Sequence, residues 1–460
     1  MPSKRFALLL AYLGLLTLAM PGLAVEVEER ISSVSIEVAV DTSRHDREKE
    51  SDRMLVTLDS EWFLTTDSGI SLVVGGRFKL DMQDNFGLNN QRFNDYYSSV
   101  SKPLELSEHA SVELRNFYFE YEPDSCLMNS DSCAWRVGKQ QIVWGQADGI
   151  KILDVVNPQS FESFILDDFN NSRTPLWTVN YEIGHGGNDF QFLWIMDPTS
   201  HFIAESERAY GVTSPQLVPD MDRYMAIHGG AEAVKVDYYD ARQINLKNSE
   251  LGFRFATFRK GWDISLNYLF KLSDLPTQTI RRRQIDGIDT LHVTFEDRRN
   301  HVLGGTLSNS FGNLTVRGEM AYISNRTWAS DISPEAITHG DELAYVIGLD
   351  WYGFGDAMVS MQYNSSHQLN RDIASNRDRV DDIITLLYKQ SFINDSLTAK
   401  VIFEHSVNIG DGLGRYSLAY GLSDETKIMA EFNQFYGSGE GIFGQYGHND
   451  HFRLLFKYTF

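Results

Sequence analysis

The residues with the most potential for chemistry gather between positions 144 and 173. The stretch reads WGQADGIKILDVVNPQSFESFILDDFNNSR and holds seven ionisable side chains among ten isoleucine, leucine, valine and phenylalanine residues. Carboxylates and cations at this density can hold ions or polar solutes, and a bound divalent cation is the weaker alternative. The apolar residues are too many for a segment in open water, so the stretch must be buried against something. Its candidate functional residues are Trp144, Gly145, Asp148, Lys151, Asp154, Asn157, Pro158, Glu162, Asp167, Asp168 and Arg173.

The rest of the sequence lacks catalytic and cofactor-binding motifs. It contains no Gly-x-Ser-x-Gly elbow, no His-Glu-x-x-His pair and no phosphate-binding loop. The histidines at 201, 301, 405, 448 and 451 are scattered along the chain. We therefore predict a protein without enzymatic activity, cofactor or resident metal ion.

The only two cysteines, Cys126 and Cys133, lie close together in EPDSCLMNSDSCAW. A close pair in an oxidising compartment predicts a disulfide. Closing a loop of about eight residues contributes about 2–3 kcal/mol to stability on the chain-entropy model. A zinc site is the alternative, and two thiols without a neighbouring histidine make a poor one.

The N-terminus predicts export. Lys4 and Arg5 precede an apolar run of about 15 residues and a small-residue site ending at Ala24, so residues 1–24 resemble a secretory signal peptide. The run is shorter than the roughly 20 residues of a spanning helix. Loss of Lys4 and Arg5 with the leader lowers the basic count from 41 to 39 against 63 acidic residues, which leaves a formal charge of −24. A chain this acidic is unlike a nucleic-acid-binding protein.

Beyond the leader, apolar and polar residues alternate along most of the chain. In GWDISLNYLFK, every second residue from Trp262 to Phe270 is apolar, and TKIMAEFN repeats the pattern. A period of two predicts strands with one buried face. A soluble sandwich would bury that face against a second sheet, whereas a membrane barrel would turn it to lipid and the polar face to a wet lumen.

Strand length and turn spacing favour the membrane barrel. Many alternating runs are about 10–12 residues long, close to the 9–11 of tilted membrane strands and longer than the 5–6 of soluble ones. Aromatic residues stand near their ends, as in the girdles of membrane barrels. Compact turns alternate with long polar segments, the pattern of periplasmic turns and external loops. We predict an all-β transmembrane antiparallel β-barrel of about 16 strands, within the range 16–18, over residues 69–460.

Residues 25–68 precede the first of these sixteen strands. They contain a charged run, DTSRHDREKESDR, and a possible extra strand, MLVTLDSEWFL. We predict a periplasmic tail or a lumen-lining segment here. The alternative is that this segment raises the strand number to eighteen.

The chain ends on an alternating strand, HFRLLFKYTF, whose one face carries Phe456, Tyr458 and Phe460. The ending resembles the C-terminal signal of Gram-negative outer-membrane barrels. That resemblance implies recognition by the barrel-insertion machinery. It also implies a barrel surrounded by outer-membrane lipid and lipopolysaccharide.

The alternation also assigns charged residues to the lumen, where the strand faces lean basic and predict a weak preference for anions. A barrel of sixteen strands encloses an aqueous channel unless something folds inward. We therefore predict that residues 144–173 form an inward constriction, with packing on the external rim or a subunit contact as the alternatives. The predicted lumen residues are Arg77, Lys79, Asp81, Arg254, Asp263, Arg317, Glu319, Lys427, Glu431, Arg453 and Lys457.

The segment RVGKQQIVWGQADGIKILDVVNPQSF carries a family resemblance. Arg136, Gly138 and Gln140, then Trp144-Gly145 and the turn at 156–158, resemble a proteobacterial family of outer-membrane proteins catalogued as a domain of unknown function. The chain is more distantly similar to the alginate-export porins. The resemblance implies an outer-membrane channel for apolar or bulky compounds that works with inner-membrane export partners.

These observations lead first to a porin-like channel that passes small or moderately bulky solutes across the outer membrane of a Gram-negative bacterium. The second hypothesis is a structural or adhesion barrel whose long loops bind external partners, and a barrel enzyme ranks third. The sequence leaves the solute, the direction of transport and the oligomeric state open.

Overall fold

The computed structural model describes residues 25–42, 52–82, 96–126, 130–145, 150, 152–204, 208–237, 242–355 and 357–460. The predicted signal peptide lies outside these residues, as do Asp148 and Lys151 of the predicted constriction. No helix within the described residues is long and apolar enough to cross a membrane.

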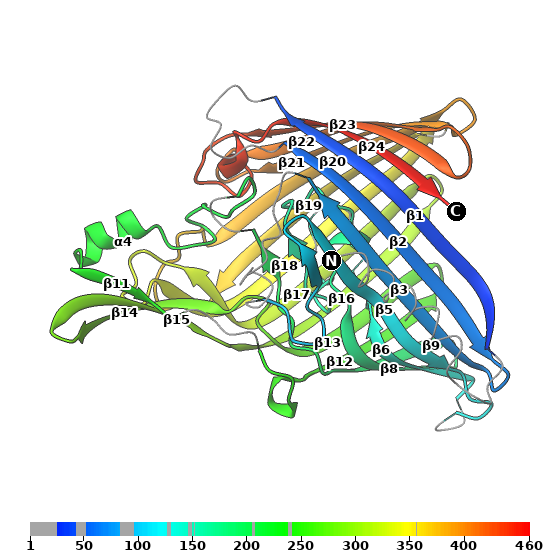
Figure 1. The fold of residues 1–460 in the computed structure, drawn as a ribbon, viewed down its shortest axis with the longest axis horizontal. Coiled ribbons are helices and arrows are strands. Elements are labelled where there is room, and N and C mark those ends of the chain that lie inside the picture. Colours follow the sequence, from blue (N-terminus) through cyan, green and yellow to red (C-terminus); the bar gives the residue numbers. More distant parts are fainter. Residues whose placement is uncertain are drawn as a thin grey trace.

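Eighteen antiparallel strands close into one barrel (Figure 1). Each strand pairs with the next one along the chain, so the topology is a simple meander that needs no crossover. The strands are β1 (Val25–Asp41), β2 (Arg53–Thr66), β3 (Ile70–Asp81), β5 (Ala110–Tyr121), β6 (Ser132–Gln140), β8 (Leu176–His185), β9 (Asn188–Ile195), β12 (Glu250–Arg259), β13 (Trp262–Leu272), β16 (Arg299–Phe311), β17 (Leu314–Ala329), β18 (Ile337–Phe354), β19 (Ala357–Leu369), β20 (Val380–Phe392), β21 (Leu397–Ser406), β22 (Gly412–Gly421), β23 (Thr426–Tyr436) and β24 (His451–Thr459).

The first and last strands close the ring. β1 pairs with β24 in an antiparallel register that runs from Ser33 opposite Thr459 to Asp41 opposite His451. On its other side β1 pairs with β2 along nearly its whole length. A nineteenth strand of the same sheet, β4 (Leu104–Ser107), pairs with the part of β5 that β6 leaves unpaired, from Ala110 to Val112.

Two details of the sequence prediction need correction. The barrel has eighteen strands, the upper limit of the predicted range, and not the sixteen counted from residue 70 onwards. The prediction of a periplasmic or lumen-lining segment at 25–68 is wrong for its described part, because β1 and β2 belong to the wall. The strand MLVTLDSEWFL was recognisable by its alternation, and its partner SSVSIEVAVD carries the same alternation from Val34 to Val40.

The two ends of the barrel differ in their connections. We call the end at which β1 begins and β24 finishes the terminal end, and the opposite end the loop end. The terminal end has compact turns, as predicted, at 67–69, 186–187, 260–261, 312–313 and 393–396. The loop end has long connections at 82–109, 141–175, 196–249, 273–298 and 437–450.

Several short elements lie within the long connections. Four of them form a projection beyond the loop end of the barrel, visible beside α4 in Figure 1, which we call the arm. The arm consists of α4 (Met221–His228), β11 (Ala233–Val236), β14 (Thr277–Ile285) and β15 (Ile288–Glu296). The remaining elements are β7 (Ser160–Phe161), α3 (Phe169–Ser172), β10 (Phe202–Ile203), η2 (Leu246–Asn248) and η3 (Gly444–Tyr446).

The strand faces follow the alternation of the sequence. On β13, Leu266 is 58% exposed on the outward face, whereas its neighbours Ser265 and Asn267 are buried on the inward face. The same division recurs on β16 and β17, where Leu303 and Met320 point outward. An apolar outer surface around a polar interior is the arrangement of a barrel with lipid outside and water inside.

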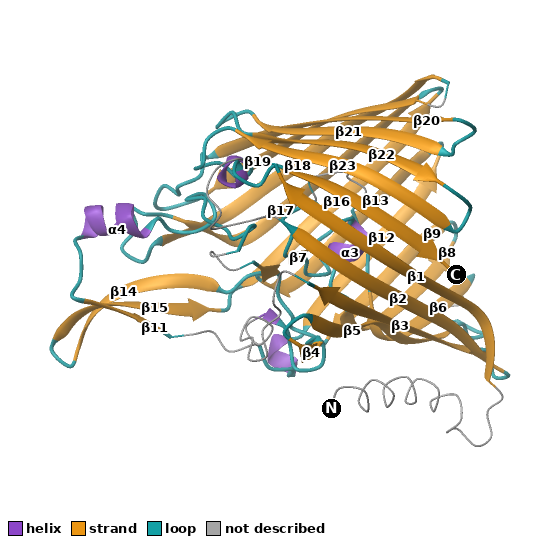
Figure 2. Ribbon diagram, turned by 45° about the horizontal axis from the view of Figure 1, so that its top comes forward, coloured by secondary structure: helices purple, strands orange, loops and turns teal. Residues whose placement is uncertain are grey.

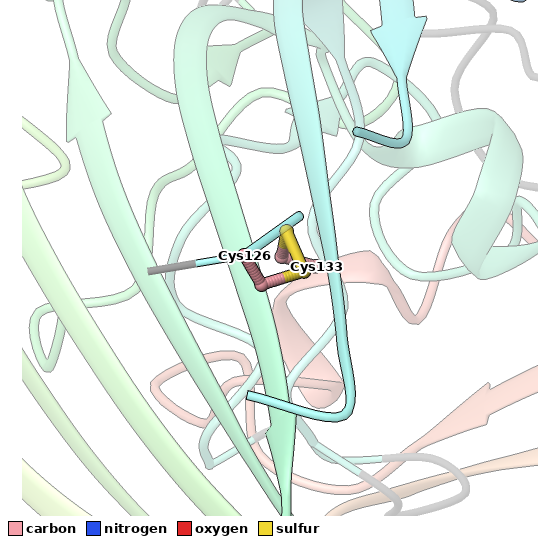
Figure 3. The surroundings of a disulfide bond; sticks show 2 residues. All are labelled: Cys126 and Cys133. Carbon is pink, nitrogen blue, oxygen red and sulfur yellow. A yellow bond between two sulfur atoms is a disulfide. The ribbon is translucent and has the colours of Figure 1, made fainter. Parts of the chain in front are cut away.

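The predicted disulfide between Cys126 and Cys133 is present, and it bridges the β5–β6 connection at the terminal end (Figure 3). The two Cα atoms are 5.7 Å apart, within the range that a disulfide spans without moving the backbone. The bond fixes the one terminal-end connection that is too long for a tight turn.

Replacing both cysteines by serine should lower the free energy of unfolding by about 2–3 kcal/mol, because the open chain regains loop entropy in the unfolded state. The measurement is urea unfolding of the refolded barrel in detergent, followed by tryptophan fluorescence. Reduced wild-type protein is the control and should match the double variant. Equal unfolding midpoints for oxidised wild type and variant would contradict the prediction.

Candidate functional site in the barrel lumen

The connection between β6 and β8, residues 141–175, folds into the barrel, and we call it the inward loop. Figure 2 shows β7 and α3 of this loop inside the ring of strands. Within the loop end, β7 pairs in parallel with β10 from the following long connection. The predicted inward position of residues 144–173 is therefore what the structure shows for the described part of the loop.

One end of the inward loop packs against the wall formed by β9, β13, β16, β17 and β18. Its side chains Trp144, Ile152, Leu153 and Val156 are at most 8% exposed. They pack against inward-facing apolar residues of that wall. These wall positions interrupt the polar lining and bury the loop without leaving space for water. The wall residues in the cluster are Leu193, Ile195, Leu269, Val302, Ala321, Ile323 and Val346.

The opposite wall holds the loop through a second apolar cluster. Phe164 and Leu166 pack against Ile383, Leu413 and Phe435 of β20, β22 and β23. The loop-end rings Phe443 and Tyr446 cover them, with Phe164 and Tyr446 only 4.7 Å apart between centroids. Burial raises the pKa of the Tyr446 phenol, so it stays neutral. The inward loop thus spans the lumen between two apolar anchors.

The third wall, formed by β24, β1, β2, β3 and β5, meets the loop through polar contacts. The Arg53 guanidinium donates to Ser163 Oγ at 2.8 Å, and that of Arg77 donates to Asn171 Oδ1 at 2.7 Å. Lys79 Nζ lies 3.4 Å from Glu162 Oε2. Arg115 donates to the Asn170 carbonyl at 2.8 Å. We call this surface the charged wall.

Buried polar groups hold the path of the inward loop. Arg173 forms a bidentate ion pair with Asp154 at 2.8 and 3.0 Å, and both side chains are nearly fully buried. Asn157 is completely buried, accepts from the Ile142 amide at 2.6 Å and donates to the Thr174 carbonyl at 2.9 Å. Fully satisfied groups of this kind fix one conformation of a buried segment.

The remaining residues of the predicted motif have local structural roles. Trp144 Nε1 donates to Gln191 Oε1 of β9 at 2.7 Å. A Cβ atom on Gly145 would lie 2.9 Å from the Asp154 amide nitrogen, so this close approach requires glycine. The Pro158 carbonyl accepts from the Thr174 amide at 2.7 Å.

Two carboxylates at the start of α3 face the charged wall. Asp167 and Asp168 form no side-chain hydrogen bond or ion pair with another described residue. Asp167 lies near enough to Arg53, Arg77 and Arg453 to act electrostatically on each of them. The loop therefore presents negative charge to a wall that carries most of the cations in this part of the lumen.

Some predicted lumen residues take part in this site, and others do not. Arg77, Lys79 and Glu319 contact the inward loop, Glu319 by accepting from the Leu153 amide at 3.3 Å. The others lie on inward-facing strand positions, where several pair across the wall. Those pairs are Asp81 with Arg53, Arg317 with Asp350, and Arg453 with Glu431 and Glu37, while Arg254, Asp263, Lys427 and Lys457 lie on β12, β13, β23 and β24.

Three basic residues of the site escaped sequence reasoning. Arg53 lies on β2, which was not assigned to the wall. Arg415 of β22 donates to the Leu166 carbonyl, which is 249 positions away in the chain. Arg115 sits in a β-bulge, because Gly75 pairs with Asn116 and Gly76 with Leu114. A bulge re-aims a side chain and breaks the period of two from which faces are predicted.

The fold and the site can now be set beside known proteins. A family model described as "Protein of unknown function (DUF1302)" matches residues 75–460. The chain belongs to this family. A search of curated proteins finds no match to the chain. Membership confirms the family resemblance of the segment around Trp144-Gly145, and the similarity to alginate-export porins stays a prediction.

Solved structures share the fold of this family member. OccAB1 of Acinetobacter baumannii superposes with a TM-score of 0.50 at 10% identity, over 94% of this chain and 97% of that one. OmpT of Vibrio cholerae, an outer membrane protein solved without its loop L8, gives 0.44 at 9% identity, over 95% and 100%. A porin mutant of Rh. blastica gives 0.38 at 10% identity over the same shares. At such identities the first of these likenesses speaks for a porin-like fold alone.

Changing Asp154 to Asn should lower the free energy of unfolding by about 3–5 kcal/mol, because Arg173 would remain buried without its counter-charge. Denaturant unfolding in detergent micelles measures the change. The matched control is Asp286→Asn in the exposed β14–β15 turn, which should stay within about 0.5 kcal/mol of wild type. Similar losses in both variants would show that the pair does not hold the loop.

Proposed function

We propose that this protein is an outer-membrane channel of a Gram-negative bacterium, narrowed by its inward loop. The observation that carries the proposal is the anchoring of that loop. It is held on two walls by dry apolar clusters and on the third by charged and polar groups. The apolar outer face and the porin-like fold support a place in a bilayer, and the predicted signal peptide supports export.

The solute path runs between the inward loop and the charged wall. The two apolar clusters leave no wet route, because their members are almost fully buried. Along β24 to β5, in contrast, the contacts are hydrogen bonds and ion pairs between side chains that water can also solvate. Polar solutes therefore pass along this one polar lining, and its charges determine which ions pass most easily.

The charge count along this path favours cations. Five cations of the charged wall and Arg415 of the nearby β22 face five carboxylates paired with them on the strands and three carboxylates from the loop. The sequence led us to expect a weak preference for anions because the lumen residues assigned from alternation held more basic than acidic groups, and the wall carboxylates Asp59, Glu113 and Glu37 were not among them. With the partners in place, we propose a weak preference for cations instead.

A structural or adhesion role rests on a different feature, the arm. Tyr224 of α4 packs with Ile280, Leu291 and Val293 of β14 and β15, so the arm has an apolar core of its own. An ordered projection at the loop end is suited to binding partners outside the cell. Contacts with lipopolysaccharide, the insertion machinery and inner-membrane export partners are further parts of the proposal.

Replacing residues 146–172 by a short Gly-Ser linker should raise the single-channel conductance severalfold, because the segment that crosses the lumen is gone. The measurement is current through the refolded protein in a planar bilayer. Heat-modifiable migration on gels is the control for a folded barrel. Unchanged conductance in a folded variant would contradict the constriction, and no conductance in either protein would contradict the channel.

Changing Asp167 and Asp168 together to asparagine should move the reversal potential in a salt gradient towards anions, because two uncompensated negative charges leave the path. Asp286→Asn on the arm is the matched control and should leave the potential unchanged. A shift of the same size in the control would contradict the prediction that the two loop carboxylates lie on the ion path.

A further inference from the structure

A small cavity lies between the charged wall and the inward loop. The wall contributes Arg77, Lys79 and Arg115 to its lining together with the single carboxylate Glu113, and the loop contributes Glu162 and Asp167. Hydroxyl and amide groups of Ser111, Ser160 and Asn171 complete the polar part. The cavity thus has a basic side and an acidic side.

The ion pairing in the lining is closer within the wall than between the wall and the loop. Arg115 is paired with Glu113 at 3.1 Å, and Arg77 with Asp59 at 2.6 Å, both within the wall. Lys79 reaches across to Glu162 at 3.4 Å, which is long for a charge-assisted hydrogen bond. Asp167, on the loop, forms no hydrogen bond or ion pair with another described residue. A ligand that inserts between Lys79 and the loop meets a cation on one side and carboxylates on the other.

Two aromatic rings from the loop end close the cavity from above. Tyr97 and Phe202 belong to different connections, and their centroids lie 5.9 Å apart. Buried hydrogen bonds fix this roof, since Asp197 accepts from Ser98 Oγ at 2.6 Å and from Thr199 Oγ1 at 2.7 Å. The roof offers apolar contact to a bound ligand.

We propose that this cavity is a binding site for small zwitterions of the α-amino acid class. The carboxylate of the ligand contacts Lys79 and Arg77, its ammonium group contacts Asp167 and Glu162, and its side chain lies under Tyr97 and Phe202. This proposal rests on the proposed function, because it makes the cavity a solute site on the channel path.

Charge matching is the physical reason for this class. A simple anion would satisfy the basic side and add a third negative charge beside two loop carboxylates. A simple cation would satisfy the loop and lie against Lys79, next to two arginines that are already paired within the wall. Burying a charge without its partner is costly, whereas a dipolar ligand aligned across the cavity pairs both of its ends.

The test compares L-alanine with its two halves, propionate and ethylamine. Calorimetric titration of the refolded protein in detergent should give an affinity for alanine at least tenfold higher than for either half. Lys79→Met and Asp167→Asn should each reduce alanine affinity about tenfold or more. The controls are Lys389→Met on β20 and Asp286→Asn on the arm, both exposed and outside the cavity, and they should bind like wild type.

The outcomes separate this proposal from the channel itself. Equal binding of propionate and alanine, no binding of alanine, or full binding in both cavity variants overturns the zwitterion site, whatever the conductance. In bilayers, alanine should also block the ion current of wild type and not that of Lys79→Met. If the protein binds alanine but does not conduct, the result supports the binding site and contradicts the channel.

Discussion

Closure of the backbone hydrogen-bond ladder is the constraint on which the rest of this structure depends. In a bilayer no water is present to satisfy a free strand edge, so a membrane-spanning sheet must pair its first strand with its last. Here β1 and β24 do so over nine residue pairs. That single pairing places residues 25–41 in the wall, sets the strand number at eighteen and puts the start of β1 and the finish of β24 at the same end of the barrel.

A barrel of this size encloses more space than its wall side chains can fill, and the inward loop occupies part of that space. Its apolar residues need dry partners, and the wall supplies them at inward positions such as Leu269 and Val346 on one side and Leu413 on the other. Apolar side chains of the loop and of the wall therefore meet at the same positions, where the lumen lining is not polar. Two anchors turn a long connection into a fixed partition.

The inward loop determines how charges are distributed across the lumen. The charged wall carries its cations in cross-strand pairs, so it is not a strongly basic surface. The bulge on β5 adds Arg115 to it by turning an extra side chain inward. The loop then brings Asp167 and Asp168 towards this wall, and the narrow space between them has opposite charges on its two sides. The proposed charge-matched recognition and the proposed ion selectivity both rest on this geometry.

The sequence by itself determined the features that depend on local periodicity. Alternation gave the strands and their faces from residue 70 onwards, turn spacing gave the two different ends, and the apolar content of 144–173 predicted a buried loop. The tertiary structure decided which strands close the ring, which wall each part of the loop contacts and which charges pair. Those contacts join residues as distant as Leu166 and Arg415, and their register shifts at bulges. A period of two tells each residue which face it takes, but only the closed barrel determines what lies opposite that face.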